Sequence, residues 1–120
     1  MRTIRFFPTA EVNGEKIEGT TAVVADVLRA TTTIVRALDN GCLAVIPVVD
    51  VKKAHDVVRS LSRHDVVVGG ERKGRKIDGF DFGNSPQEYT RERIQDKVLV
   101  ITTTNGTKAL VRAAKAAATL

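Results

Sequence analysis

Carboxylate side chains follow directly after apolar runs at two points of this sequence. Asp26 follows the run TAVVA at 21–25, and Glu71 follows the run 66–68 and two glycines. A carboxylate in this position suits a metal ligand or a nucleophile. Two carboxylates beside an anion site suggest Mg²⁺, which takes one or two carboxylates together with oxygens of the substrate. The alternative for Asp26 is a helix-capping role.

Two segments rich in threonine each open a predicted helix. The free N–H groups at the start of a helix attract an anion, and threonine hydroxyls add donors. Arg29 suits a bidentate contact to phosphate or carboxylate. The alternative is that a threonine only caps each helix and that Arg29 pairs with Asp26. Because two such segments occur in one chain, we favour anion binding, and the candidates are Arg29, Thr31, Thr32, Thr33, Thr102, Thr103, Thr104, Asn105 and Gly106.

Strand and helix patterns alternate along the chain. Apolar runs and β-branched residues predict strands, and apolar side chains at helical spacing predict helices. The predicted strands are 4–7, 21–25, 44–49, 66–68 and 98–101, and the predicted helices are 31–40, 52–62 and 107–118. Pro47 suggests that its strand is an edge strand or contains a bulge. This order predicts an α/β fold with three layers, α/β/α, around a largely parallel sheet.

One long segment, 71–97, lacks a regular pattern. A loop of that length without structure is uncommon and is usually functional. Within it, Ser85 and Glu88 match a capping box with Pro86 at the first helical position, so a short helix is predicted there. In sheets of this kind ligands bind beyond the carboxyl ends of the strands. Asp26, Glu71 and both threonine segments would therefore meet at one edge of the sheet.

The composition describes one globular domain, residues 1–120, with an affinity for anions. The chain has 120 residues, 42% of them apolar, and a formal charge of +5. Nucleic acid is not the favoured partner, because basic residues are dispersed among acidic ones and the chain has no Trp and one Tyr. No apolar run is long enough to span a membrane. With one cysteine and no apolar segment at its start, the chain is expected to be cytoplasmic.

The same segments resemble the 2-phosphosulfolactate phosphatase family. The matching stretches are VVADVLRATTTIVRALDNG at 23–41, GGERKGRKIDGFDFGNSPQEYT at 69–90 and VLVITTTNGTKAL at 98–110. The resemblance implies a Mg²⁺-dependent phosphatase that hydrolyses 2-phosphosulfolactate to sulfolactate and phosphate, on a route to coenzyme M. Under it, Asp26, Glu71 and Arg29 are the catalytic candidates, with the metal at Asp26 and Glu71. Asn84 and Ser85 join the anion-binding residues.

Family members are about twice as long, so the chain resembles their N-terminal half. We therefore expect an incomplete fold in which some apolar sheet surface and one strand edge lie bare, and a homo-oligomer could cover them. Two alternatives to the enzyme remain. One is a non-catalytic anion-binding fragment or shortened homologue, and the other is a basic nucleic-acid binder, which salt-dependent DNA retention would reveal.

Overall fold

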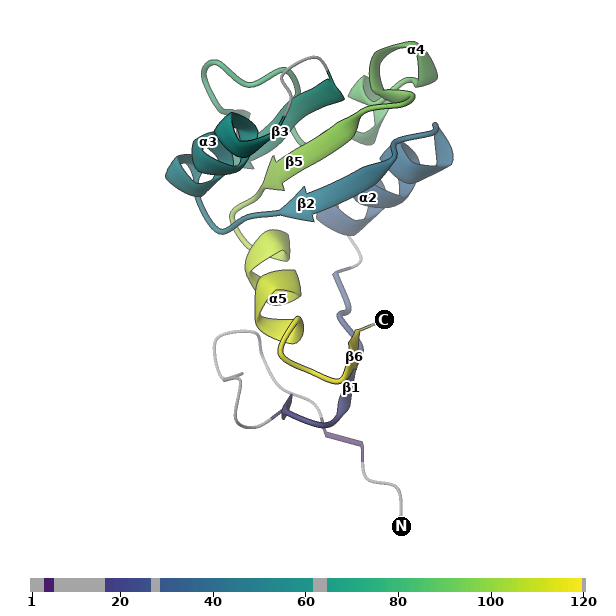
Figure 1. The fold of residues 1–120 in the computed structure, drawn as a ribbon, viewed down its shortest axis with the longest axis vertical. Coiled ribbons are helices and arrows are strands. Elements are labelled where there is room, and N and C mark those ends of the chain that lie inside the picture. Colours follow the sequence, from purple (N-terminus) through teal and green to yellow (C-terminus); the bar gives the residue numbers. More distant parts are fainter. Residues whose placement is uncertain (1–3, 6–16, 27–28, 62–64, 120) are drawn as a thin grey trace.

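The computed structural model describes residues 4–5, 17–26, 29–61 and 65–119, and Figure 1 shows their arrangement. The helices are α2 (Ala30–Asp39), α3 (Val51–Ser60), α4 (Arg91–Ile94) and α5 (Gly106–Ala113), with a 3-10 turn η3 (Pro86–Glu88). The strands are β1 (Thr21–Ala22), β2 (Ala44–Pro47), β3 (Val66–Arg72), β4 (Arg75–Lys76), β5 (Val98–Thr102) and β6 (Ala118–Thr119). Four of these strands form the main sheet.

The main sheet has the order β2-β5-β3-β4. Strand β5 pairs in parallel with β2 on one side and β3 on the other, and Leu99 lies opposite both Val45 and Val67. Only β4 is antiparallel, through a hairpin with β3. Because β5 is central and covered on both faces, it is an uninterrupted apolar run up to its last residue. The predicted α/β class is confirmed.

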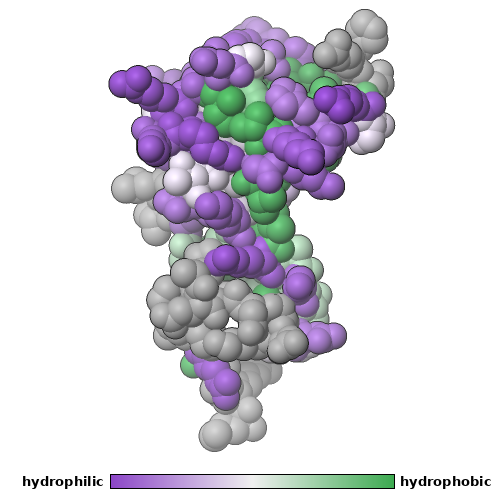
Figure 2. All heavy atoms as spheres, turned by 90° about the vertical axis from the view of Figure 1, so that its left-hand side faces the viewer, coloured by the Kyte–Doolittle hydropathy of each residue, from purple (hydrophilic) through white to green (hydrophobic). Residues whose placement is uncertain are grey.

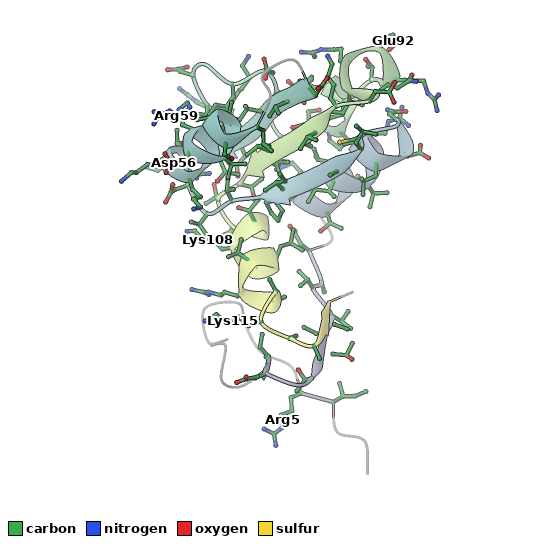
Figure 3. The ribbon with its side chains drawn as sticks, viewed as in Figure 1. Arg5, Asp56, Arg59, Glu92, Lys108 and Lys115 are labelled. Carbon is green, nitrogen blue, oxygen red and sulfur yellow. The ribbon has the colours of Figure 1, made fainter. Side chains whose placement is uncertain are left out.

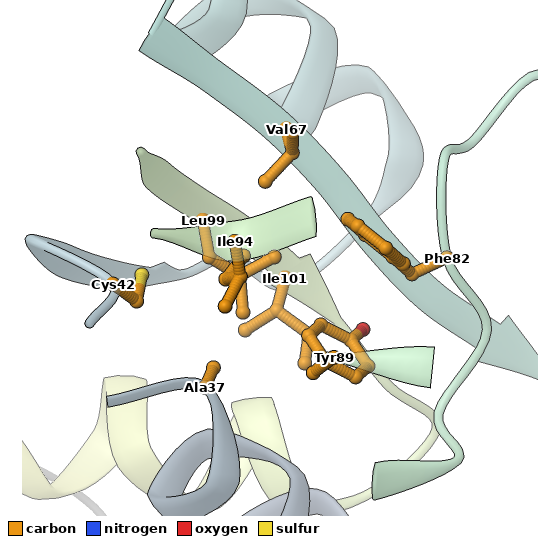
Figure 4. Close-up of a cluster of buried hydrophobic side chains, with 8 residues drawn as sticks. All are labelled: Ala37, Cys42, Val67, Phe82, Tyr89, Ile94, Leu99 and Ile101. Carbon is orange, nitrogen blue, oxygen red and sulfur yellow. The ribbon is translucent and has the colours of Figure 1, made fainter. Parts of the chain in front are cut away.

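Helices cover both faces of this sheet and give three layers. On one face, Leu99 and Ile101 pack with Ala37 of α2 and with Tyr89 and Ile94 from the segment before β5, as Figure 4 shows. On the other face, Val100 packs with Ala54 of α3. Alternate residues of β5 therefore serve two cores, which is the period-two rule of a strand buried on both sides.

Strand β2 lies at the edge of the main sheet, as Pro47 predicted. Proline has no N–H, so it cannot donate to β5 at its own position. The Val48 N–H donates to the Ile101 carbonyl instead, at 2.9 Å. The strand thus keeps its pairing at the carboxyl edge, where the candidate site lies.

The prediction of a doubly buried strand at 21–25 is wrong. Only Thr21 and Ala22 are strand residues, and they pair with β6 in a separate two-stranded sheet. Val23 is 73% exposed. An apolar run indicates that its residues tend to be buried, but it does not indicate which strand they pair with. In this structure β5 is the central strand of the main sheet. In the predicted strand 4–7, residues 4 and 5 are not strand residues and the other two lie outside the described residues.

The segment 71–97 is not the structureless loop that was expected. Strand β3 continues to Arg72 and turns back through Lys73 and Gly74, whose φ angles are 53° and 80°. A two-residue turn with both φ values positive matches the twist of a hairpin, but lysine is an unusual residue for it. The capping box predicted at Ser85 is not formed, because the Ser85 side chain makes no capping hydrogen bond and the Glu88 carboxylate accepts from the Gly83 N–H instead. The segment forms a 3-10 turn rather than an α-helix, and α4 follows it.

The last predicted helix ends earlier than its composition suggests. Helix α5 stops at Ala113, although the alanines continue. The backbone N–H groups of Ala117 and Ala118 donate to the Thr20 carbonyl, at 2.8 and 3.4 Å. Pairing with the segment before β1 thus replaces helical hydrogen bonds. As Figure 1 shows, α5 and the β1–β6 pair extend below the main sheet, and the whole chain measures 47 × 27 × 27 Å.

In Figure 2 the face on the α3 side is largely hydrophilic, with apolar side chains visible between the charged ones. The exposed large apolar side chains include Val35 and Leu38 of α2, and Leu43 just before the edge strand β2. Cys42 is buried, as expected of a small core residue, and His55 is exposed on α3.

Candidate anion-binding site

Among the residues that the structure describes, the N-terminus of α2 has no side-chain cap. The residue before the helix, Arg29, has φ 76° and ψ −71°, and its side chain makes no capping hydrogen bond. The first backbone bond of the helix runs from the Thr33 N–H to the Arg29 carbonyl, at 2.7 Å. The N–H groups at Ala30, Thr31 and Thr32 precede that bond, so the positive end of the helix is available to an anion.

Neither alternative interpretation of this segment is found. Thr33 is buried, and its hydroxyl donates to the Asn84 carbonyl at 3.1 Å rather than capping the helix. Among the described residues, the ion pairs are Arg36–Asp39 and Arg59–Asp56. Arg29 is exposed and belongs to neither pair. Asp26 also does not cap α2, because the capping position is Arg29.

The start of α5 differs from that of α2, because hydroxyl groups of its own threonines accept hydrogen bonds from backbone N–H groups there. The Thr103 hydroxyl accepts from the Thr107 N–H at 3.1 Å, and the Thr107 hydroxyl accepts from the Thr103 N–H at 3.0 Å. Both side chains are buried. This reciprocal arrangement resembles a capping box. A capping role at the start of α5 therefore explains the Thr103 hydroxyl, and contact of Thr103 with a ligand stays a prediction.

Glu71 joins the end of β3 to the loop after β5. Its Oε1 accepts from the Thr104 N–H at 2.7 Å, and its Oε2 accepts from the Thr104 hydroxyl at 3.0 Å and the Gly74 N–H at 2.8 Å. The side chain is 6% exposed. Burial raises the pKa of Glu71, but the hydrogen bonds from Thr104 and Gly74 and the charge of Arg29 outweigh it, so the net shift is downward. Glu71 is therefore held as a carboxylate.

Asp26 and Arg29 lie on either side of the contacts that Glu71 makes with Thr104 and Gly74. Gly106 opens α5, and a methyl group there would collide with the Asp26 carboxylate and the Ala30 side chain, and would lie 3.3 Å from the Thr103 hydroxyl. The glycine thus allows Asp26 to approach the start of α5. On the other side, an Arg29 Nη2 lies 4.0 Å from the Cβ position of Gly74. The structure therefore brings both carboxylates and Arg29 to one edge.

Asn84 adds a buried oxygen beside α2. It is 8% exposed, and its Oδ1 is buried without a hydrogen-bond partner in the described part of the chain. An unpaired buried carbonyl costs free energy, so such an atom often marks a position that a ligand, ion or water completes. Its neighbour Ser85 is exposed. The hydrogen bond from the Thr33 hydroxyl to the Asn84 backbone carbonyl places Asn84 against the first turn of α2.

Arg72 belongs to this edge, although the sequence analysis did not select it. Its guanidinium donates to the Thr102 hydroxyl and the Glu71 carbonyl, both at 2.8 Å, and to the Val49 carbonyl at 3.4 Å. One side chain thus ties together the carboxyl ends of three neighbouring strands. The signal in the sequence was an arginine directly after the strand-terminal Glu71, and it was overlooked because the segment was treated as a loop.

The predicted residues therefore fall into two groups. Thr33, Glu71, Thr102, Thr103 and Thr104 use their side chains for bonds within the protein. The remaining candidates have no side-chain hydrogen bond in the described part of the chain: Asp26, Arg29, Thr31, Thr32, Asn84, Ser85 and Asn105. No group of three or more His, Cys, Asp or Glu side chains that could hold a metal occurs among the described residues.

The fold is thus a layered α/β domain in which an uncapped helix start and carboxylates meet at the carboxyl edge of the sheet, an arrangement suited to an anionic ligand. Residues 6–120 match the family model described as 2-phosphosulpholactate phosphatase, and the chain belongs to that family. The resemblance inferred from the sequence is confirmed.

Curated relatives from clostridia agree with this assignment. The chain is 52% identical over 101 residues to a probable 2-phosphosulfolactate phosphatase of Clostridium novyi, and 51% identical over 100 residues to one of Clostridium acetobutylicum. These alignments cover 84% and 83% of this chain, but 43% and 42% of the relatives. The chain thus spans less than half the length of these relatives. No helix in the described residues is both long and apolar enough to cross a membrane.

Proposed function

We propose that this chain supplies the phosphate-binding edge of a Mg²⁺-dependent phosphatase that hydrolyses 2-phosphosulfolactate to sulfolactate and phosphate, a reaction of coenzyme M biosynthesis. The observation that carries the proposal is the uncapped start of α2, with the cation Arg29 before it and the Asn84 side chain beside it. Family membership supports the reaction class. A small anionic substrate and a cytoplasmic location follow from the same proposal.

The residues of this chain would divide the work of phosphate hydrolysis. The N–H groups of α2 and the Arg29 guanidinium would neutralise phosphoryl oxygens, which lowers the barrier to breaking the P–O ester bond. Asp26 would face the same group from the start of α5. Glu71 would keep the Thr104 loop and the Gly74 turn at fixed positions, so that the donors are in place before the substrate arrives.

The oxygen donors present fit Mg²⁺. This ion takes one or two carboxylates and completes its shell with water and substrate oxygens, so it does not require a cluster of three. Asp26 has no hydrogen bond in the described part of the chain, and Glu71 keeps one of its acceptor directions beyond the three that are used. These two side chains would hold the metal, which when bound stabilises the charge that develops on the phosphoryl group.

Release of inorganic phosphate from 2-phosphosulfolactate tests this proposal. Activity should require Mg²⁺, should stop with EDTA and should return when Mg²⁺ is restored. Asp26→Asn should remove most of the activity while leaving the thermal unfolding transition in place, because an amide is a poor Mg²⁺ ligand and a poor nucleophile. Asp56→Asn on the exposed face of α3 is the matched control (Figure 3). Near-normal turnover of Asp26→Asn would contradict the assignment.

A non-catalytic anion-binding role is the second candidate, because the chain spans less than half of its relatives. In that case phosphate or sulfolactate should bind in a calorimeter while phosphate release stays at background. The exposed Val35, Leu38 and Leu43 beside the edge strand β2 make self-association a further prediction. Light scattering checks it, and a monomer with full turnover would show that one such domain is sufficient.

A further inference from the structure

The Asn84 side chain combines burial with an unused hydrogen-bond acceptor. The residue is 8% exposed, and its oxygen Oδ1 has no hydrogen-bond partner among the described residues. Within that part of the chain, no other buried side-chain oxygen or nitrogen lacks a partner. A buried acceptor without a donor is unfavourable, so it marks a position where a ligand or a water supplies the donor.

Side-chain hydrogen bonds fix the backbone on both sides of this side chain. The Gly83 N–H donates to the Glu88 carboxylate at 2.9 Å. The Asn84 carbonyl accepts from the Thr33 hydroxyl at 3.1 Å, in the first turn of α2. Because other side chains hold this segment in place, the Asn84 amide is not needed to hold its own backbone. Its oxygen is left for a partner from outside the described chain.

Asn84 lies where the proposed phosphate donors are. Phe82 bridges in parallel to Gly69 of β3, so the chain from Phe82 to Asn84 runs toward the carboxyl edge of the sheet. There the bond to Thr33 sets Asn84 against the uncapped start of α2, which follows Arg29. The backbone N–H groups and the guanidinium are donors only, whereas Oδ1 is an acceptor only. The site therefore offers several donors and one buried acceptor.

An acceptor among donors distinguishes anions by whether they carry a proton. Inorganic phosphate keeps at least one O–H group at neutral pH, and a phosphate monoester gains one with a second pKa of about 6. Sulfate and sulfonates are fully ionised at neutral pH and offer acceptor oxygens only. A sulfate oxygen facing Oδ1 would set two acceptors against each other, whereas a phosphate O–H would satisfy the amide oxygen.

We propose that Asn84 Oδ1 accepts a hydrogen bond from a protonated oxygen of the phosphoryl group at the start of α2, and that this bond makes the site select phosphate over sulfate and sulfonate. The inference rests on the proposed function, because it takes the phosphate to lie at that helix terminus. It also deepens that function. The proposed substrate carries both a phosphate and a sulfonate, and the acceptor directs the phosphate to α2.

Calorimetric titration of the 120-residue chain with sodium phosphate and with sodium sulfate, at pH 7 and equal ionic strength, tests the inference. The chain should bind phosphate about tenfold to one-hundredfold more tightly than sulfate, because phosphate completes a buried hydrogen bond that sulfate leaves unmade. Sulfate carries at least as much negative charge at this pH, so charge attraction alone does not give this preference.

Asn84→Leu removes the acceptor at similar side-chain volume. It should weaken phosphate binding and bring the two affinities to within about twofold of each other, because neither anion then meets a buried acceptor. Asn84→Ala repeats the test if thermal unfolding shows that the leucine variant does not fold. Gln87→Leu is the matched control, because it removes the same amide from an exposed position of η3 and should leave the preference unchanged.

Equal binding of the two anions by the unmodified chain would overturn the inference, and so would a preference that survives in the Asn84 variants. A preference that Gln87→Leu also abolishes, or an equal loss of affinity for both anions in the Asn84 variants, would overturn it too, because either pattern is a general effect on the fold. If the unmodified chain binds neither anion, the proposed function fails with it. Equal binding of both anions leaves the site at α2 and removes the role of Asn84 alone.

Discussion

Replacing Glu71 with glutamine should uncouple the end of β3 from the loop after β5. The carboxylate accepts three hydrogen bonds, from the Thr104 N–H, the Thr104 hydroxyl and the Gly74 N–H. Glutamine keeps one accepting oxygen for the Thr104 N–H. Its amide NH₂ would face the Gly74 N–H, and two donors cannot bond to each other.

The expected loss follows from these bonds. A hydrogen bond to a charged group contributes about 1.5–3 kcal/mol, and a bond of that kind is removed at Gly74. Gly74 is exposed, so water replaces part of that bond, while the bonds to Thr104 lose their charge. We expect the free energy of unfolding to fall by about 2 kcal/mol at pH 7, within the same range. Urea denaturation measures it, and Glu18→Gln at an exposed position is the control.

The pH dependence distinguishes this explanation from a general packing defect. The pKa of Glu71 in the folded state lies below its ordinary value of 4.5, because the hydrogen bonds from Thr104 and Gly74 outweigh the effect of burial. A carboxyl group with a lowered pKa stabilises the fold above its unfolded pKa and loses that contribution as the pH falls through its folded pKa. The difference between wild type and Glu71→Gln should therefore be largest near pH 7 and shrink below pH 4.5. A difference that stays constant across this range would refute the reasoning.

Three further substitutions test the site and its support. Arg29→Gly relieves a positive φ that costs a non-glycine residue about 1–2 kcal/mol, so the free energy of unfolding in urea should rise by about 1 kcal/mol. Phosphate binding should weaken at least about tenfold by calorimetry, because the guanidinium is lost. Gly106→Ala should lower the unfolding free energy by about 1–3 kcal/mol and weaken phosphate binding, because the new methyl group collides with Ala30 and so displaces the first turn of α2; the same two assays apply. Tyr89→Phe removes a buried 2.7 Å bond to the Gly83 carbonyl and should cost about 1–2 kcal/mol in urea denaturation, without a change in phosphate binding.

The main sheet was predictable because a strand buried on both faces is an uninterrupted run of apolar residues in the sequence. β5 is apolar at four successive positions, and α3 repeats its apolar residues with helical spacing. A similar apolar run at 21–25 led to a wrong strand prediction, because such a run does not indicate which strand it pairs with. The early end of α5 was also not predictable from the sequence, because it depends on backbone hydrogen bonds to the Thr20 carbonyl rather than on the helix propensity of alanine.

The hairpin was missed because its turn breaks the usual rule of residue choice. A two-residue turn with positive φ at both positions normally carries Asn or Gly at the first, and here Lys73 occupies it. With the turn unrecognised, Arg72 was treated as a loop residue rather than as the end of a strand. Its role in joining three strand ends depends on β2, β3 and β5 being neighbours, which is a property of the folded sheet.

Two helix termini that looked alike in the sequence differ in what satisfies their backbone N–H groups, and this difference is why the proposed phosphate site is placed at α2 rather than at α5. At α5 the paired Thr103 and Thr107 side chains meet the backbone donors, so an anion there would have to displace bonds already made. At α2 no side chain of the described residues does so, and a strained residue, Arg29, lies directly before the helix. Strain of this kind persists only where the surroundings enforce it, and it concentrates at functional sites. Both termini therefore share a hydroxyl-rich sequence, but only the start of α2 leaves backbone donors for the proposed phosphate, while Gly106 at the start of α5 lets Asp26 approach.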